Sequence, residues 1–123
     1  EGDFVRLMSL HKSKGLTSRV TIIVGCIHGL IPFVDDDLSP AELPAHTQEQ
    51  RRLFYVALTR AKEILVLSSV VSVPRQMAHR IGAIVRGGNA QNGNTIACQF
   101  VQELGPQALP AQLGTAWAAG GFQ

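Results

Sequence analysis

Several features common in secreted and membrane-spanning proteins are missing from this sequence. Its 123 residues include only two cysteines, Cys26 and Cys98, which form no CxxC pair. So few cysteines argue against a disulfide framework and favour a reduced, cytoplasmic location. No apolar run approaches the roughly 18 residues that a membrane span needs, and the start of the chain lacks a signal-peptide pattern. We therefore expect neither a membrane partner nor export.

Metal-binding patterns are also lacking. Cys26 and His28 have a spacing that fits no zinc motif, so a cysteine buried beside a strand is the simpler interpretation. Asp35, Asp36 and Asp37 lack the twelve-residue loop and closing glutamate of a calcium site, and we interpret them as a solvated turn. The sequence thus predicts no metal site.

Charge is missing from one end of the chain. All eleven lysines and arginines precede Gly87, and residues 87–123 carry a single charged side chain, Glu103. The net charge of +2 permits a nucleic-acid partner without demanding one, because the position of the cations matters more than their sum. Apolar residues make up 46%, which is enough for a core, and the length suits one small domain.

Short apolar runs and one helical pattern predict an α/β fold. A helix is expected over 47–63, with Thr47 as its N-cap and an inward stripe that includes Leu53 and Ala57. The runs rich in β-branched residues or leucine are typical of strands in a parallel sheet covered on both faces. They span residues 5–10, 20–26 and 64–71. The order β–α–β then indicates helices packed on a mainly parallel sheet.

The remaining segments read as loops, a short helix and a tail. Residues 28–46 and 86–95 have the proline, glycine and asparagine content of loops, and a helix is expected over 95–104. The segment 105–123 has the composition of a flexible tail. Three strands would leave both sheet edges open, so we expect a larger natural domain and self-association of the isolated chain. A start at Glu1 also suggests a fragment.

The stretch from Met8 to Leu16, MSLHKSKGL, gathers polar and cationic groups at the end of the first expected strand. Ser9 and His11 would share one face there, where ligands of parallel sheets bind. The following turn bends at Gly15 and carries Lys12, Lys14 and Arg19. A hydroxyl, an imidazole and cations suit a phosphate backbone, although a solvated basic loop is the commoner explanation of such residues.

The second informative stretch lies on the expected helix, EQRRLFYVALTRAK over residues 49–62. Arg52, Val56 and Arg60 recur at i, i+4 and i+8, which places both arginines near one helical face. The neighbouring row is Arg51, Tyr55 and Thr59. Arginines on a rigid helix can reach a γ-phosphate during phosphoryl transfer. A basic exterior face is the alternative that these residues leave open.

Together the two stretches resemble a known family. His11-x-x-Lys14-Gly15-Leu16, an apolar strand and Gly29-x-x-Pro32 resemble motif V of superfamily-1 helicases, and the stretch from Glu49 to Ala61 resembles motif VI. Phe100-x-x-Glu103-Leu104 is similar to the segment that follows motif VI in UvrD/Rep/PcrA-like proteins.

The resemblance implies a partial RecA-like fold. Residues 1–104 would be the C-terminal part of the second motor domain, with motif V at about 8–17 and motif VI at about 49–62. The family's fold pairs two such domains around ATP, with single-stranded DNA running across them. The missing N-terminal motor domain would then be a partner, and the function that of a fragment of an ATP-dependent DNA helicase.

Site residues follow from the same resemblance, position by position. Arg60 would be the arginine finger, and Gly15, Arg52 and Tyr55 would join it around ATP. The expected DNA contacts are Ser9, His11, Lys12 and Lys14. Lys14 and Gly15 would also form the turn that links the DNA and ATP sites.

Departures from the family pattern keep a second function open. Thr17 stands where the family usually has a glutamate that contacts the ribose, and Gln50 replaces a common glutamate. The chain lacks a Gly-x-x-x-x-Gly-Lys-Ser/Thr phosphate loop and an Asp-Glu pair after an apolar strand. ATP and Mg²⁺ would therefore act only in the full-length protein, and this chain alone should not hydrolyse ATP. The alternative is a non-catalytic nucleic-acid-binding or interaction module descended from a helicase.

Overall fold

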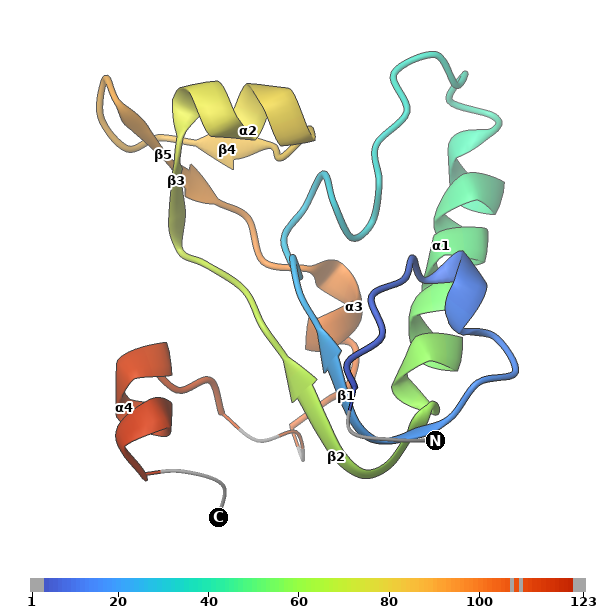
Figure 1. Ribbon diagram of the computed structural model, residues 1–123. Coiled ribbons are helices and arrows are strands. Elements are labelled where there is room, and N and C mark those ends of the chain that lie inside the picture. Colours follow the sequence, from blue (N-terminus) through green and yellow to red (C-terminus); the bar gives the residue numbers. More distant parts are fainter. Residues whose placement is uncertain (1–3, 107, 109, 121–123) are drawn as a thin grey trace.

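The computed structural model of the chain describes residues 4–106, 108 and 110–120. Figure 1 shows a two-stranded sheet with helices beside it, and a smaller helix-and-strand unit at one end. The elements are, in chain order, η1 (His11–Ser13), β1 (Ser18–Ile23), α1 (Leu43–Leu58), β2 (Ala61–Leu67), β3 (Ser72–Pro74), α2 (Arg75–Ile81), β4 (Val85–Arg86), β5 (Asn92–Thr95), α3 (Gln99–Gln102) and α4 (Gly114–Gly120). None of the helices in these described ranges is long and apolar enough to cross a membrane.

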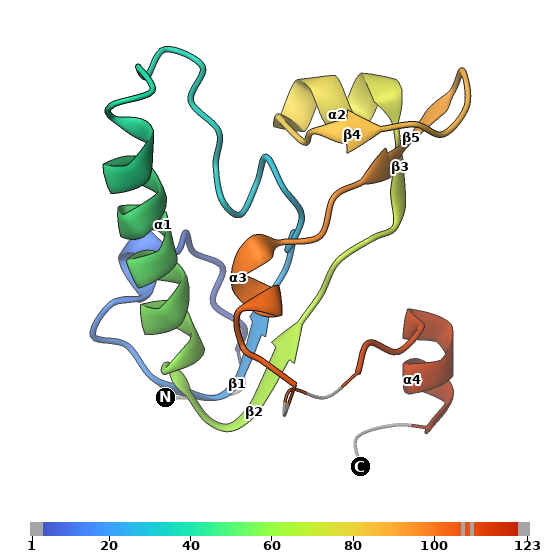
Figure 2. The same ribbon diagram turned by 180° about the vertical axis from the view of Figure 1, so that it is seen from behind.

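The predicted β–α–β unit is confirmed. Strands β1 and β2 pair in parallel, with Val20 opposite Ile64 and Ile23 opposite Leu67. Figure 2 shows α1 and α3 next to each other beside this sheet. The main core lies between these elements and includes Ile23, Cys26, Phe54, Ala57, Cys98 and Phe100. Burial of Cys26 beside a strand is thus confirmed.

The expectation of a sheet covered on both faces is wrong for this structure. Val20, Ile22 and Val24 alternate with the buried Ile23, and they are 42%, 56% and 69% exposed. Strand side chains alternate between the two faces of a sheet. One face of the β1–β2 pair therefore packs on the core and the other is open to solvent within the described part of the chain.

A second unit makes the fold mixed rather than mainly parallel. Strands β3, β5 and β4 form an antiparallel sheet in that order, and α2 packs against β3 and β5. This unit has its own core of Ile27, Val73, Ala78 and Ala83. The segment 86–95 was expected to be a loop, but antiparallel pairing of Val85 with Thr95 brings its ends into strands.

A close backbone approach at Gly29 joins the two units. The His28 N–H donates to the Ile96 carbonyl at 2.8 Å, and the Ile84 N–H donates to the His28 carbonyl at 3.1 Å. Gly29 has φ of +101°, and a Cβ atom there would lie 2.3 Å from the Gly82 carbonyl oxygen. Glycine is required here both for this backbone conformation and for this contact.

The strand expected over 5–10 is absent. Val5 is 86% and Leu7 is 94% exposed, and the chain enters the 3-10 turn η1 directly after Leu10. A strand needs hydrogen bonds to a neighbouring strand, and the described residues supply none beside this segment. The apolar pattern alone could not reveal that missing neighbour.

The long helix is displaced toward the N-terminus from its expected position. It spans Leu43–Leu58, and its N-cap is Glu42 rather than Thr47. Pro44 lies in the first turn, where its fixed φ favours helix initiation. At the other end, pairing of Ala61 with Ser18 begins β2, so Arg60 lies in the turn after the helix.

The last expected helix is much shorter than predicted. Helix α3 spans only Gln99–Gln102, because Asn92–Thr95 joins a sheet and Ala97 bridges to Ile27. Within the segment 105–123, the structure places α4 at Gly114–Gly120, an element that the composition did not predict.

Candidate functional site

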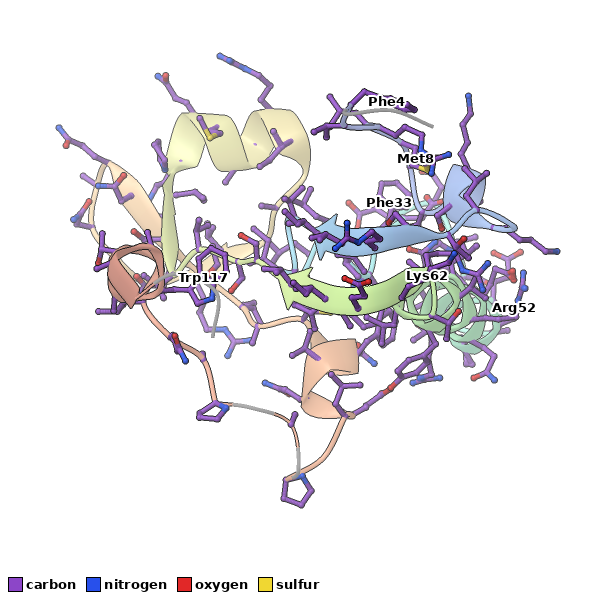
Figure 3. All side chains as sticks on the ribbon, turned by 60° about the horizontal axis from the view of Figure 1, so that its bottom comes forward. Phe4, Met8, Phe33, Arg52, Lys62 and Trp117 are labelled. Carbon is purple, nitrogen blue, oxygen red and sulfur yellow. The ribbon has the colours of Figure 1, made fainter. Side chains whose placement is uncertain are left out.

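The outer side of α1 carries an open hollow of about 610 Å³. Figure 3 shows Arg52, one of its lining residues, on the side of α1 that faces away from the strands. Both rows predicted from the helical spacing contribute to the hollow. Its walls are Ala45, Gln48, Glu49, Arg51, Arg52, Tyr55, Val56 and Thr59.

Arg60 lies at the end of this hollow, in the turn between α1 and β2. Its Nε donates to the Val56 carbonyl at 3.0 Å, and one Nη donates to the Thr59 hydroxyl at 2.9 Å. Val56 and Thr59 both line the hollow. The other Nη donates to the Leu16 carbonyl at 3.4 Å, so all three oxygens that hold the guanidinium among the described residues are neutral.

The other two arginines have carboxylate partners. Arg51 forms a bidentate pair with Glu103, with Nε–Oε1 and Nη2–Oε2 distances of 2.9 and 3.0 Å. Arg52 pairs with Glu49 one turn earlier on α1. These hydrogen bonds lower the pKa of each carboxyl group, chiefly through Arg51 for Glu103 and through Arg52 for Glu49. Among the described residues Arg60 has no carboxylate partner, so its charge, unlike those of Arg51 and Arg52, is not balanced by a carboxylate there.

Tyr55 faces α3. Its hydroxyl donates to the Glu103 carboxylate at 3.3 Å and lies 3.5 Å from the Phe100 carbonyl. Burial raises the pKa of Tyr55, and the negative charge of Glu103 raises it further. Tyr55 therefore forms a wall of the hollow while its hydroxyl is held by the neighbouring helix.

The segment 9–16, here called the basic turn, lies against α1, where η1 contacts the helix (Figure 1). Ser9, His11, Lys12 and Lys14 are all exposed. The turn is closed by hydrogen bonds from Lys12 N–H to the Ser9 carbonyl and from the Ser13 hydroxyl to the Leu10 carbonyl. His11 and Lys14 are close enough to α1 to add to the lowering of the Glu49 pKa that Arg52 dominates.

The expected bend at Gly15 is present, with φ of +83° and open space where a Cβ would lie. Gly15 therefore shapes the turn by its conformation rather than by a tight contact. The predicted sharing of a strand face by Ser9 and His11 is not observed, because His11 begins η1. Cations and imidazole still project from one short turn.

Thr17 and Gln50, the two positions that depart from the family pattern, both accept hydrogen bonds from other parts of the chain. The Thr17 carbonyl accepts a hydrogen bond from Arg6 at 3.2 Å, and the exposed Thr17 lies between η1 and β1. The Gln50 side chain accepts from the Phe33 N–H at 3.1 Å and so supports the loop that precedes α1.

Sequence reasoning missed two participants in the site. Glu103 lies in the segment similar to the one after motif VI, but its pattern predicts no role for it, although it binds both Arg51 and Tyr55. The Leu16 carbonyl is a main-chain group, so no residue pattern could identify it as the partner of Arg60. Across the described ranges, no group of three or more His, Cys, Asp or Glu could hold a metal ion.

Comparison with known proteins identifies the family. The model of the UvrD-like helicase C-terminal domain matches residues 1–72, which contain the basic turn, α1 and Arg60. The chain belongs to this family. The match ends at Ser72, the first residue of β3, so it leaves out the rest of the antiparallel unit and all of α3.

Several relatives are helicases by name. The putative ATP-dependent DNA helicase YjcD of Bacillus subtilis is 41% identical over 78 residues, which cover 62% of this chain and 10% of that protein. The ATP-dependent DNA helicase Rep of Buchnera aphidicola is 39% identical over 69 residues, covering 56% and 10%. PcrA of Staphylococcus aureus is 37% identical over 68 residues, covering 55% and 9%. The chain thus spans about a tenth of the length of these relatives.

Proposed function

We propose that this chain is the C-terminal part of the second motor domain of an ATP-dependent DNA helicase or translocase. Membership of the UvrD-like helicase family supports the proposal. The observation that carries it is the contrast between two arginines that line the hollow and Arg60, which is bound to two of the lining residues. Arg51 and Arg52 are paired with carboxylates, whereas the partners of Arg60 within the described part of the chain are neutral oxygens.

In this proposal Arg60 is the arginine finger. A guanidinium without a carboxylate partner can exchange weak hydrogen bonds for a phosphate at little electrostatic cost. Nucleotide binding would bring the other motor domain to this face, and Arg60 would then stabilise the charge that develops on the γ-phosphate. Gly15, Arg52 and Tyr55 would complete this side of the ATP site, while Mg²⁺ would be held by residues outside this chain.

The basic turn would contact single-stranded DNA. Ser9, His11, Lys12 and Lys14 are exposed on and around η1, and cations and hydroxyls of this kind bind phosphate oxygens. Because Arg60 hydrogen-bonds to Leu16 in the same turn, a change at the nucleotide would reach Lys14, which is separated from Leu16 only by Gly15, directly along the main chain. Alternate closing and opening of the motor domains would then move the protein along the strand.

The test compares ATP turnover, with and without single-stranded DNA, by the full-length gene product and by this chain alone. The expected result is hydrolysis stimulated by DNA in the full-length protein and none in the isolated chain, since the latter has no phosphate loop. No hydrolysis by the full-length protein would refute the motor proposal.

Thr17 favours one alternative. A side chain shorter than the family's usual glutamate stands beside the turn, so nucleotide recognition could have been lost while nucleic-acid binding was kept. Under this alternative the chain is a non-catalytic nucleic-acid-binding or interaction module derived from a helicase. Retained binding of single-stranded DNA by the full-length protein, without ATP turnover, would select it.

A further inference from the structure

Glu103 does not line the hollow, but it binds two of the side chains that do. It is the C-cap of α3 and lies beyond the residues matched by the family model. Its carboxylate accepts hydrogen bonds from Arg51 and Tyr55, both of which line the hollow. One side chain outside the site therefore orients two side chains inside it.

All three nitrogens of the Arg51 guanidinium donate hydrogen bonds to side chains. Two of its nitrogens bind Glu103, and Nη1 donates to the Gln48 side chain at 2.8 Å. Its central carbon also lies 5.4 Å from the centre of the Phe100 ring, within the range of a cation–π contact. With all three nitrogens engaged, Arg51 is kept against α3 and its charge is balanced there.

Helix α3, whose C-cap is Glu103, packs in the main core through Phe100 and the preceding Cys98. Phe100 and Cys98 are 0% and 1% exposed. The ring centroids of Phe54 on α1 and Phe100 on α3 lie 5.7 Å apart. Because this ring contact fixes α3 to α1, the Glu103 carboxylate is held in place beside Arg51 and Tyr55.

We propose that Glu103 is a positioning residue for ATP, acting through Arg51 and Tyr55. This inference rests on the proposed function, because it takes the hollow on α1 as one side of the nucleotide site. Loss of the carboxylate releases the Arg51 guanidinium and the Tyr55 hydroxyl from the positions in which these hydrogen bonds hold them. The wall of the hollow is then no longer ordered before nucleotide arrives, and ATP binding has to order it.

The proposal predicts an effect on binding rather than on the chemical step. Interactions that are made equally in the ground and transition states alter KM and leave kcat unchanged. In the full-length protein, Glu103→Gln should raise the KM for ATP about 5- to 10-fold and keep kcat within about 2-fold. Glu103→Asp, whose carboxylate is one methylene shorter, should give the same direction of change. The matched control is Gln102→Ala, an exposed neighbour on α3 that should leave both constants unchanged.

A double-mutant cycle separates positioning from a general loss of stability. If Glu103 acts through Arg51 and Tyr55, the double variant Arg51→Gln with Glu103→Gln should raise the KM by less than the product of the two single effects. Multiplied effects on KM would overturn the proposal. So would an unchanged KM in Glu103→Gln, whatever its melting temperature.

Binding of a fluorescent ATP analogue, measured beside turnover, distinguishes failure of this inference from failure of the proposed function. If the wild-type protein binds the analogue without turnover, the motor proposal fails. Weaker binding by Glu103→Gln would then still support the positioning role, and equal binding would refute it. No binding by the wild type would overturn both.

Discussion

The guanidinium of Arg60 donates a hydrogen bond to the main-chain carbonyl of Leu16, with 3.4 Å between Nη1 and the oxygen. Arg60 follows α1, whereas Leu16 ends the basic turn that carries His11 and Lys14. The Ser18 N–H donates in turn to the Arg60 carbonyl at 3.0 Å. Arg60, the candidate arginine finger, is therefore joined by a direct hydrogen bond to the candidate DNA-binding turn.

Removal of the Arg60 guanidinium should abolish most ATP turnover and spare DNA binding. In the full-length protein, Arg60→Ala is expected to lower kcat by about 10³-fold or more, because a finger arginine stabilises charge mainly in the transition state. Arg60→Lys should restore little, since an ammonium group lacks the planar fork. Steady-state ATPase assays and fluorescence-anisotropy titration with single-stranded DNA measure the two effects.

The control for this prediction is Arg19→Ala. Arg19 is an exposed arginine on β1 whose partner is Glu63, and it lies outside the hollow. Its loss should leave turnover within about 2-fold, since exposed ion pairs contribute little. Turnover by Arg60→Ala equal to that of Arg19→Ala would refute the assignment of the finger.

Substitution in the basic turn should act on DNA rather than on ATP. His11→Ala is expected to weaken binding of single-stranded DNA or to reduce its stimulation of ATP hydrolysis, because His11 is exposed on η1 beside α1. Lys14→Ala should also reduce the dependence of log affinity on log salt by about one unit, as expected for one lost phosphate contact. Lys62→Ala on β2 is the matched control. DNA-stimulated hydrolysis by His11→Ala at the wild-type level would count against this role.

Local patterns predicted the central part of the fold well. The helix that carries Leu53 and Ala57 and the parallel pairing of its flanking strands are both present, because helical spacing and β-branched runs report on burial directly. The expectation that Arg52 and Arg60 share a helical face was wrong. Arg60 leaves the helix because the next residue, Ala61, pairs with Ser18, and this long-range constraint has no local signature.

The antiparallel unit was the least predictable part. Its strands include the sequence from Asn92 to Thr95, whose residues favour turns, and they are held in place by pairing with Val73 and Val85. The role of Glu103 was missed for a related reason. Its partners lie about fifty residues away in sequence, and the core that contains Phe54 and Phe100 brings them together.

Gly29→Ala should destabilise the chain strongly. The residue has φ of +101°, and its Cβ would lie 2.3 Å from the Gly82 carbonyl oxygen. Left-handed backbone costs a non-glycine residue roughly 1–2 kcal/mol, and overpacking adds roughly 1–3 kcal/mol. Chemical denaturation followed by circular dichroism should show a loss of about 2 kcal/mol or more.

A second glycine substitution provides the comparison. Gly114→Ala lies in α4 with nothing within 4 Å of the added Cβ. Alanine is the better helix former, so this variant should be neutral or slightly more stable. Equal stability of the two variants would show that the approach between Gly29 and Gly82 is not tight in solution.

The stability of the chain should fall in alkaline solution because of Cys26. Burial, together with the smaller effect of the neighbouring Cys98, raises the pKa of this thiol from its ordinary value of 9.0 to about 11. Between these values the unfolded state loses the proton while the folded state keeps it. The free energy of unfolding should therefore decrease with pH in this window, by at most about 1.4 kcal/mol per pH unit for one thiol. Below pH 9 the contribution is fully present.

Urea denaturation of wild type and Cys26→Ala at several pH values measures this slope. The variant should be less stable overall but should lose stability less steeply above pH 9. Identical slopes for the two proteins would mean that the Cys26 thiol titrates in the folded state as it does in the unfolded chain.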